Sequence, residues 1–175
     1  KQMKNISKKI SSARKLSKSK IQIGIESAFK NLALKNSKID FNLTESDEFN
    51  KNGINNIEVL YKPSEQSSPK LLSKIASGGE KSRILFALKS ILSKKIDLPT
   101  LVFDEIDSGT SGEVANAIGK MMKIMGKKIQ IIAITHLPQV ASLADYHYKV
   151  FKIEGEKNIS THIKKLDKSS RIKEI

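Results

Sequence analysis

Two short apolar segments constrain the fold of this chain most strongly, because each runs directly into polar side chains. Residues 99–103 lead into Asp104 and Glu105, and residues 129–134 lead towards His136. A short, continuous apolar run of this kind is typical of a buried strand in a parallel sheet. Ligands of open α/β sheets bind where such strands end. The acids and the histidine are therefore candidate ligand-binding residues.

The rest of the chain alternates helical and strand patterns, which predicts an α/β fold. A polar loop that contains Asn52 and Gly53 is expected to join an antiparallel strand pair at a sheet edge. The expected elements are a helix over 1–34 with a break near 17–20, strands over 40–43 and 57–61, helices over 78–94, 111–125 and 138–143, strands over 146–153 and 158–163, and a last helix capped by Ser169 and Ser170.

The first helix carries an apolar stripe with the spacing of a coiled coil. Its members follow one another at intervals of three or four residues, and Ser and Lys fill the positions between them. They are Met3, Ile6, Ile10, Ala13 and Leu16. The stripe covers about two heptads and predicts the end of a longer coiled-coil helix.

Positive charge is concentrated in the same helix. The formal net charge is +14, and residues 1–38 hold eleven Lys and Arg side chains against Glu26 alone. Such a stripe can neutralise nucleic-acid phosphates without reading sequence. The candidate DNA contacts are Lys8, Lys9, Arg14 and Lys15. A solvated helix face accounts for the same lysines equally well, and no aromatic side chain is interleaved with them to stack on bases.

Composition excludes several other classes of protein. The chain has no Cys, which excludes disulfides and thiolate metal sites and fits a reducing compartment. It contains no uncharged apolar run of 18 residues and no secretory signal pattern, so we expect no membrane span.

Ser77, Gly78, Gly79 and Glu80 form a small-residue turn that opens an amphipathic segment. Backbone N–H groups, a hydroxyl and a helix N-terminus would suit a phosphate. An ordinary capped helix start has the same pattern. Likewise, a strand-end carboxylate such as Asp104 can hold Mg²⁺, and a second carboxylate beside it, such as Glu105, can orient water. An acid pair by itself also occurs in ordinary polar loops. A lone histidine such as His136 is most often structural.

The order of these segments is more specific than any one of them. Residues 71–83, 99–112 and 131–145 have the arrangement of the signature, Walker B and switch elements of ABC-type ATPases. In detail, the stretches Lys74–Glu80, Phe103–Asp107 and Ile134–Val140 resemble the RecN family of SMC-like ATPases. The resemblance implies the C-terminal lobe of a P-loop ATPase head over 35–175, truncated at its C-terminus, after the end of a basic coiled-coil arm over 1–34.

The resemblance also implies a role for each motif residue, with ATP and Mg²⁺ as cofactors. Asp104 would support Mg²⁺ through water, Glu105 would polarise the attacking water, and His136 would contact the γ-phosphate. Residues from the other motifs would act on nucleotide held by a second head or lie in the loop between the paired sites. These are Ser77, Gly78, Gly79 and Glu80 of the signature, and Asp107, Ser108 and Gly109 of the D-loop.

A head of this type is split between the two ends of a chain. No G-x-x-x-x-G-K-[ST] loop occurs in this sequence, so we expect the Walker A loop to come from an N-terminal lobe and the present chain to be inactive alone. The implied function is ATP hydrolysis in DNA double-strand-break repair and recombination. The implied partners are that lobe, a second head and DNA, in the bacterial cytoplasm at the nucleoid.

Two alternatives belong to other classes of function. The chain could be a noncatalytic DNA-binding or scaffolding module that uses the basic helix. The presence of Asp104, Glu105 and His136 together disfavours this alternative. It could also be the head of another SMC-like ATPase. Ile106-Asp107 and the stretch His136–Gln139 fit RecN more closely than its relatives.

Overall fold

The computed structural model describes residues 2–75, 78–93, 95–96, 98–104, 106, 110, 112–154 and 158–175. It divides into two compact units, residues 1–97 and 98–175. The Walker B and switch segments lie in the second unit, and the signature segment lies in the first.

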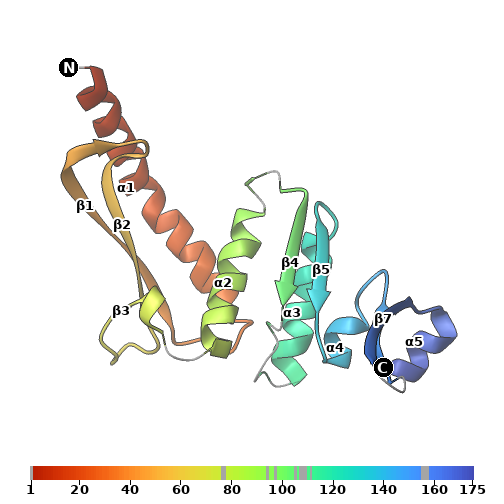
Figure 1. Cartoon of the computed structure of the whole chain (residues 1–175). Coiled ribbons are helices and arrows are strands. Elements are labelled where there is room, and N and C mark those ends of the chain that lie inside the picture. Colours follow the sequence, from red (N-terminus) through yellow and green to blue (C-terminus); the bar gives the residue numbers. More distant parts are fainter. Residues whose placement is uncertain are drawn as a thin grey trace. The chain divides into compact units, whose positions relative to one another are not determined.

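The first unit is built around a long helix and a β-hairpin (Figure 1). Helix α1 (Gln2–Phe29) lies along the antiparallel strands β1 (Lys38–Asn50) and β2 (Gly53–Lys62). The short strand β3 (Lys70–Leu71) pairs with β2, a 3₁₀ turn η1 (Leu72–Lys74) follows, and helix α2 (Gly78–Leu92) completes the unit. Its core contains Ile25, Phe29, Leu32, Ile39, Tyr61, Ile84 and Phe86.

Helix α1 is continuous through residues 17–20, so the break expected there is wrong. Lys18 in that stretch forms an ion pair with Asp40 of β1 at 2.7 Å, and no Pro or Gly interrupts the backbone hydrogen bonds. The helix ends before residue 34 because Ala33 adopts a positive φ of 55° and Leu34 N–H donates to Phe29 O. This pairing is a Schellman-type helix end.

The hairpin is longer than the sequence pattern indicated. The polar loop expected between the strands is wrong, because β1 continues to Asn50 and β2 begins at Gly53, with a register irregularity between Glu45 and Asn50. Gly53 has φ 97° and lies against Ile10 of α1, a conformation that glycine adopts without strain. The polar strand ends are therefore ordered by contact with α1 and not by an apolar alternation of their own.

The second unit contains a parallel pair of strands and an antiparallel hairpin. Strands β4 (Thr100–Asp104) and β5 (Gln130–Ile134) pair in parallel and are joined through helix α3 (Gly112–Met125). Helix α4 (Pro138–Ala141) follows, and then β6 (Tyr148–Glu154) pairs with β7 (Ile159–Lys165) before helix α5 (Lys168–Glu174). The α5 cap is Asp167, which accepts from Ser170 N–H at 2.7 Å, and not the serines expected from the sequence.

One face of the β4–β5 pair is covered and the other is open. Leu101 and Phe103 are buried, whereas the alternate side chains are 51% exposed at Val102, 44% at Ile132 and 54% at Ile134. The parallel pairing was predicted correctly, but the expectation that both strands are buried is wrong in this structure. A parallel strand pair normally has both of its faces covered.

Among the described residues, no helix combines the length and the apolar character that a bilayer crossing requires. Helix α1 is long enough, but it is rich in Lys and Ser and has a buried face that includes Ser7 and Ser11.

Helices α3 and α4 make a close approach that depends on Gly119. A Cβ placed there would lie 2.9 Å from Leu143 Cδ1 and 3.2 Å from the backbone oxygen of Gln139. The buried face of α3 consists of Ala115, Ile118, Gly119, Met122 and Met125.

We expect Gly119→Ala to lower the free energy of unfolding by about 1–3 kcal/mol, because the added methyl group overpacks this contact. Urea unfolding followed by circular dichroism measures the change. Gly24→Ala in α1 is the matched control, since its Cβ would meet only Ile91 Cδ1, at 3.4 Å, and alanine favours a helix. Equal losses in both variants would contradict the packing role of Gly119.

Candidate functional site

The predicted site residues fall partly within the described structure. Asp104 and His136 lie in the second unit, and Gly78, Gly79 and Glu80 open α2 in the first. The remaining residues of the predicted ATPase motifs lie outside the described residues. They are Ser77, Glu105, Asp107, Ser108 and Gly109.

Asp104 and His136 come to the same edge of the parallel pair. Asp104 is the last residue of β4 and lies opposite Ile134, the last residue of β5. His136 follows two residues later, and both side chains are exposed. Because parallel strands end at a common edge, a carboxylate and an imidazole are presented to solvent on one side of the sheet.

The turn that carries His136 is held locally. The Thr135 hydroxyl accepts a hydrogen bond from Leu137 N–H at 3.0 Å, and Pro138 then starts α4 in its first turn. Further along, the Arg171 guanidinium donates to the carbonyls of Ala141 and Ser142 at the end of α4. These contacts fix the direction of the chain after β5 and keep His136 at the sheet edge.

A carboxylate at this edge suits Mg²⁺, which takes oxygen ligands and retains several waters. Among the described residues, no cluster of three or more His, Cys, Asp or Glu side chains could hold a metal ion by itself. Asp104 is the described residue of the predicted set with the right chemistry, and phosphate oxygens would complete the coordination of a nucleotide-bound ion.

The first turn of α2 is tied to the hairpin by a residue that the sequence analysis did not single out. Tyr61 of β2 is 1% exposed, and its hydroxyl donates to Glu80 Oε1 at 2.6 Å. Burial, and then the bond to the Glu80 carboxylate, raise the pKa of Tyr61, so the phenol stays protonated. Alternation over 57–61 placed Tyr61 on one strand face, but its partner on α2 is a tertiary contact that periodicity does not indicate.

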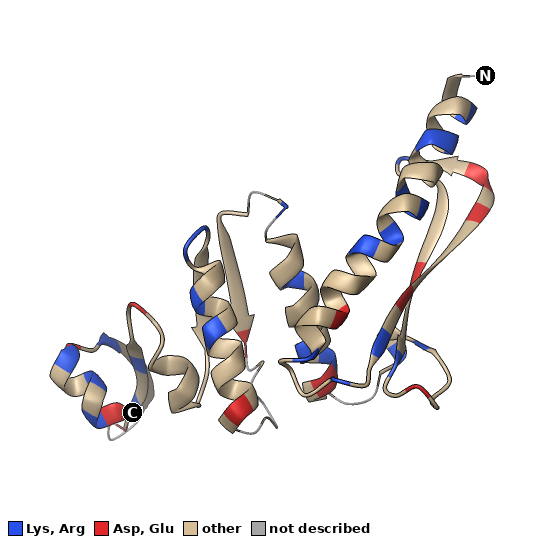
Figure 2. Ribbon diagram, turned by 180° about the vertical axis from the view of Figure 1, so that it is seen from behind, with Lys and Arg blue, Asp and Glu red and all other residues tan. Residues whose placement is uncertain are grey.

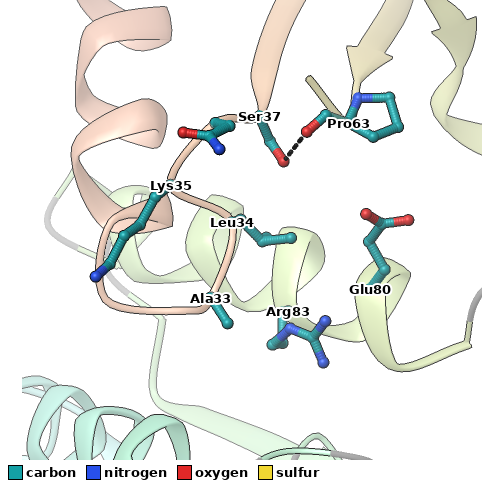
Figure 3. A pocket seen from close by; sticks show the side chains of 8 residues that line it. Ala33, Leu34, Lys35, Ser37, Pro63, Glu80 and Arg83 are labelled. Carbon is teal, nitrogen blue, oxygen red and sulfur yellow. Dashed lines mark hydrogen bonds between the residues drawn. The ribbon is translucent and has the colours of Figure 1, made fainter. Parts of the chain in front are cut away.

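A pocket of about 390 Å³ opens beside this contact (Figure 3). The segment 33–37 forms one wall, and Pro63, Glu80 and Arg83 contribute to the others. Ser37 Oγ donates to the Pro63 carbonyl at 3.2 Å. Arg83 Nε is buried with no hydrogen-bond partner among the described residues.

Lys and Arg residues recur along α1 (Figure 2). The four candidate DNA contacts among them differ in their surroundings. Arg14 donates to Asn55 Oδ1 at 3.1 Å and to the Asn52 carbonyl at 2.7 Å, so it holds the hairpin turn against the helix. Lys15 Nζ lies 3.4 Å from a Glu45 carboxylate oxygen. Lys8 and Lys9 are exposed and are therefore the better placed of the four to meet a phosphate backbone.

Most of the apolar stripe of α1 faces away from the hairpin, although Ile10 lies against Gly53. Met3, Ile6 and Leu16 are exposed, and the hairpin also contacts the face that carries Ser11, whose hydroxyl donates to Asn55 Oδ1 at 2.8 Å. These three exposed side chains are thus available to another helix.

Comparison with known proteins points to one kind of relative. The chain is 35% identical over 170 residues to the DNA repair protein RecN of Rickettsia bellii, covering 97% of the chain and 31% of the relative. It is 31% identical over 172 residues to RecN of Haemophilus influenzae, with 98% and 31% covered. RecN of Bacillus subtilis is 41% identical over 123 residues, 70% of the chain and 21% of the relative.

The chain thus spans about a third or less of the length of these curated relatives. No protein-family profile matches it.

Solved structures show the same fold at low sequence identity. An Smc head domain with a coiled coil and joint from Pyrococcus yayanosii aligns with a TM-score of 0.68 and 20% identity, over 87% of this chain and 28% of that one. A chain solved in work on ATP-driven dimerisation and DNA-stimulated activation of SMC ATPases aligns with a TM-score of 0.60 and 20% identity, over 94% and 93%. The mixed α/β architecture after a long helix is therefore that of an SMC head.

Proposed function

Because the chain is a RecN-like C-terminal segment with the fold of an SMC head, we propose that it forms the C-terminal half of an ATPase head. The complete protein would bind and hydrolyse ATP in the repair of DNA double-strand breaks and in recombination. The observation that carries this proposal is the shared edge of β4 and β5, where Asp104 and His136 are both exposed. Such a function implies a location at the bacterial nucleoid.

In this proposal each motif residue has one task. Asp104 would support Mg²⁺ through water, and Glu105, the next residue, would polarise the water that attacks the γ-phosphate. His136 would contact that phosphate. Phosphoryl transfer depends mainly on charge neutralisation and on an aligned nucleophile; the Mg²⁺ ion that Asp104 helps to hold would supply the first, and Glu105 the second.

The first turn of α2 would act on the nucleotide of a second head. Backbone N–H groups at a helix start favour an anion. Among the described residues beyond its chain neighbours and the backbone of its own helix turn, no atom lies within 4 Å of the position that a Gly78 Cβ would take, which would leave room for a phosphate beside the backbone. Two heads would then enclose two ATP molecules. The signature residues Ser77–Glu80 would close each site, and Asp107–Gly109 would lie between the sites.

The missing Walker A loop would come from the remaining part of the RecN-like protein. Two open apolar surfaces support such a partner within the same protein. One is the uncovered face of the β4–β5 pair at Val102, Ile132 and Ile134, and the other is the stripe on α1. A parallel pair normally has both faces covered. The matched segment is 31% of the Rickettsia bellii relative, so the rest of such a protein is more than twice as long as this segment and could provide the cover. This chain alone would not hydrolyse ATP.

A second candidate function rests on the basic surface of α1. A noncatalytic DNA-binding module would need only exposed lysines such as Lys8 and Lys9 and would make no use of Asp104 or His136. The two functions are separable, because DNA binding without ATP turnover in the complete protein would support the module alone.

We expect Glu105→Gln in the complete protein to lower steady-state ATP turnover by about 100-fold or more, because an amide cannot accept the proton of the attacking water. Binding of a fluorescent ATP analogue should change little, and this chain without its other half should show no turnover. Wild-type turnover in the variant would remove Glu105 from the catalytic role.

We expect Ile132→Lys to prevent reassembly of this chain with its missing N-terminal lobe, because a charge would be buried on the β4–β5 face. Co-purification of the separately produced halves measures it. Ile124→Lys on α3 is the matched control, since Ile124 is also exposed but lies off this face. Equal recovery with both variants would argue against the open face as the contact.

We expect Lys8→Gln combined with Lys9→Gln to weaken DNA binding of the complete protein and to lower the salt slope of log K by about 2, as two phosphate contacts are lost. Fluorescence anisotropy over a salt series measures both quantities. Lys168→Gln with Lys173→Gln on α5 removes the same charge elsewhere. Identical slopes in the two double variants would mean that α1 is only a solvated surface.

A further inference from the structure

Tyr61 lies where three segments of the first unit meet. Its ring packs edge-on against Phe29 at the end of α1, with ring centroids 6.3 Å apart and planes at 85°. Its oxygen reaches Ser37, at the start of the hairpin, and Glu80, in the first turn of α2. One buried side chain therefore touches the long helix, the hairpin and the helix that follows the signature glycines.

The hydrogen bonds around this hydroxyl have a defined direction. A phenol has a single proton, and the Glu80 carboxylate accepts it at 2.6 Å. Ser37 Oγ lies 2.8 Å from the same phenol oxygen and 3.2 Å from the Pro63 carbonyl. Because the Tyr61 proton points to Glu80, Ser37 Oγ faces both the phenol oxygen and the Pro63 carbonyl with its own single proton, which the two acceptors share. The result is a short polar chain from the loop after β2 to the start of α2.

Hydrogen bonds also join the second half of α1 to the hairpin close to Tyr61. Gln22 Nε2 donates to the Ile39 carbonyl at 2.5 Å, and Ile39 N–H donates to Glu26 Oε1 at 3.3 Å. Ile39 is the cross-strand partner of Tyr61. A displacement of the second half of α1 would consequently carry the β1–β2 strands, and with them Tyr61, along with it.

The bond to Glu80 is costly to break. Tyr61 is almost fully buried, so a rotated phenol would leave a polar group without water or a partner. A hydrogen bond to a carboxylate is also stronger than one between neutral groups. The first turn of α2 is thereby held at one position relative to the hairpin.

We propose that Tyr61 is a positioning residue, which sets the signature turn for contact with nucleotide by holding Glu80 against the β1–β2 hairpin and the end of α1. This role rests on the proposed function of the signature turn. Tyr61 itself need not touch nucleotide. Movement of the helical arm and closure of the heads would be linked through this one hydroxyl.

The test is Tyr61→Phe in the complete protein. The change keeps the ring and its contact with Phe29 but removes the donor to Glu80. We expect ATP-dependent head association, measured by light scattering, to weaken about tenfold, in line with the loss of one charge-assisted hydrogen bond. Binding of a fluorescent ATP analogue to the separate heads should be unchanged. Tyr148→Phe on exposed β6 removes the same group elsewhere and should have no effect.

A second comparison separates positioning from a general loss of stability. In a Glu80→Ala background, Tyr61→Phe should produce no further loss of association, because the bond is already absent. Additive losses in the double variant would overturn the role of Tyr61. So would a lower unfolding midpoint in Tyr61→Phe accompanied by normal association. If Tyr61→Phe does not fold, Glu80→Ala alone removes the acceptor of the phenol, and normal association in that variant overturns the role.

The outcomes also distinguish this inference from the function on which it rests. No ATP-dependent association of the wild-type protein would overturn the proposed ATP sandwich and the role of Tyr61 together. Normal association in both the wild type and Tyr61→Phe would leave the proposed function standing and would overturn only the positioning role.

Discussion

The parallel pairing of β4 with β5 is the constraint on which the second unit depends. In-register pairing brings Asp104 opposite Ile134 and so carries the histidine that follows β5 to the same edge as the carboxylate. The crossover through α3 buries one face of the pair, and the close α3–α4 approach at Gly119 fixes the chain after His136. The same pairing leaves Val102, Ile132 and Ile134 in solvent. This exposed face is one that a parallel strand pair normally has covered.

The first unit depends on contacts of another kind. The distal half of its hairpin has little apolar alternation, and polar bonds hold it to α1. Ser11 and Arg14 both reach Asn55, and Gly53 lets the turn pass close to the helix. At the other end of the hairpin, away from its turn, the contact with α1 becomes apolar, and Phe29, Ile39 and Tyr61 are buried there. The basic stripe of α1 thus serves two purposes, since part of it builds the hairpin contact and part remains exposed.

How much of the structure the sequence indicates varies with the physical origin of each feature. Helix α2, the β4–α3–β5 crossover and the C-terminal hairpin were predicted because apolar periodicity and glycine punctuation are local signals. The long polar strands, the unbroken α1 and the Asp167 cap were not, because their stabilising partners lie elsewhere in the chain or because several polar residues compete for one cap. Five of the predicted motif residues lie outside the described structure, and the roles of all the predicted site residues stay predictions.

The sequence by itself determined the order of the motifs and the family resemblance, because these depend on residue types and on their spacing along the chain. It also determined that no phosphate-binding Gly-Lys-Ser/Thr loop is present in this segment. Only the tertiary structure decided which side chains meet. Strand register places Asp104 and His136 at the same sheet edge, Arg14 bonds to the hairpin turn while Lys8 is exposed, and Tyr61 of β2 bonds to Glu80 of α2. Each of these pairings joins residues far apart in sequence, and a local pattern carries no signal of such a contact.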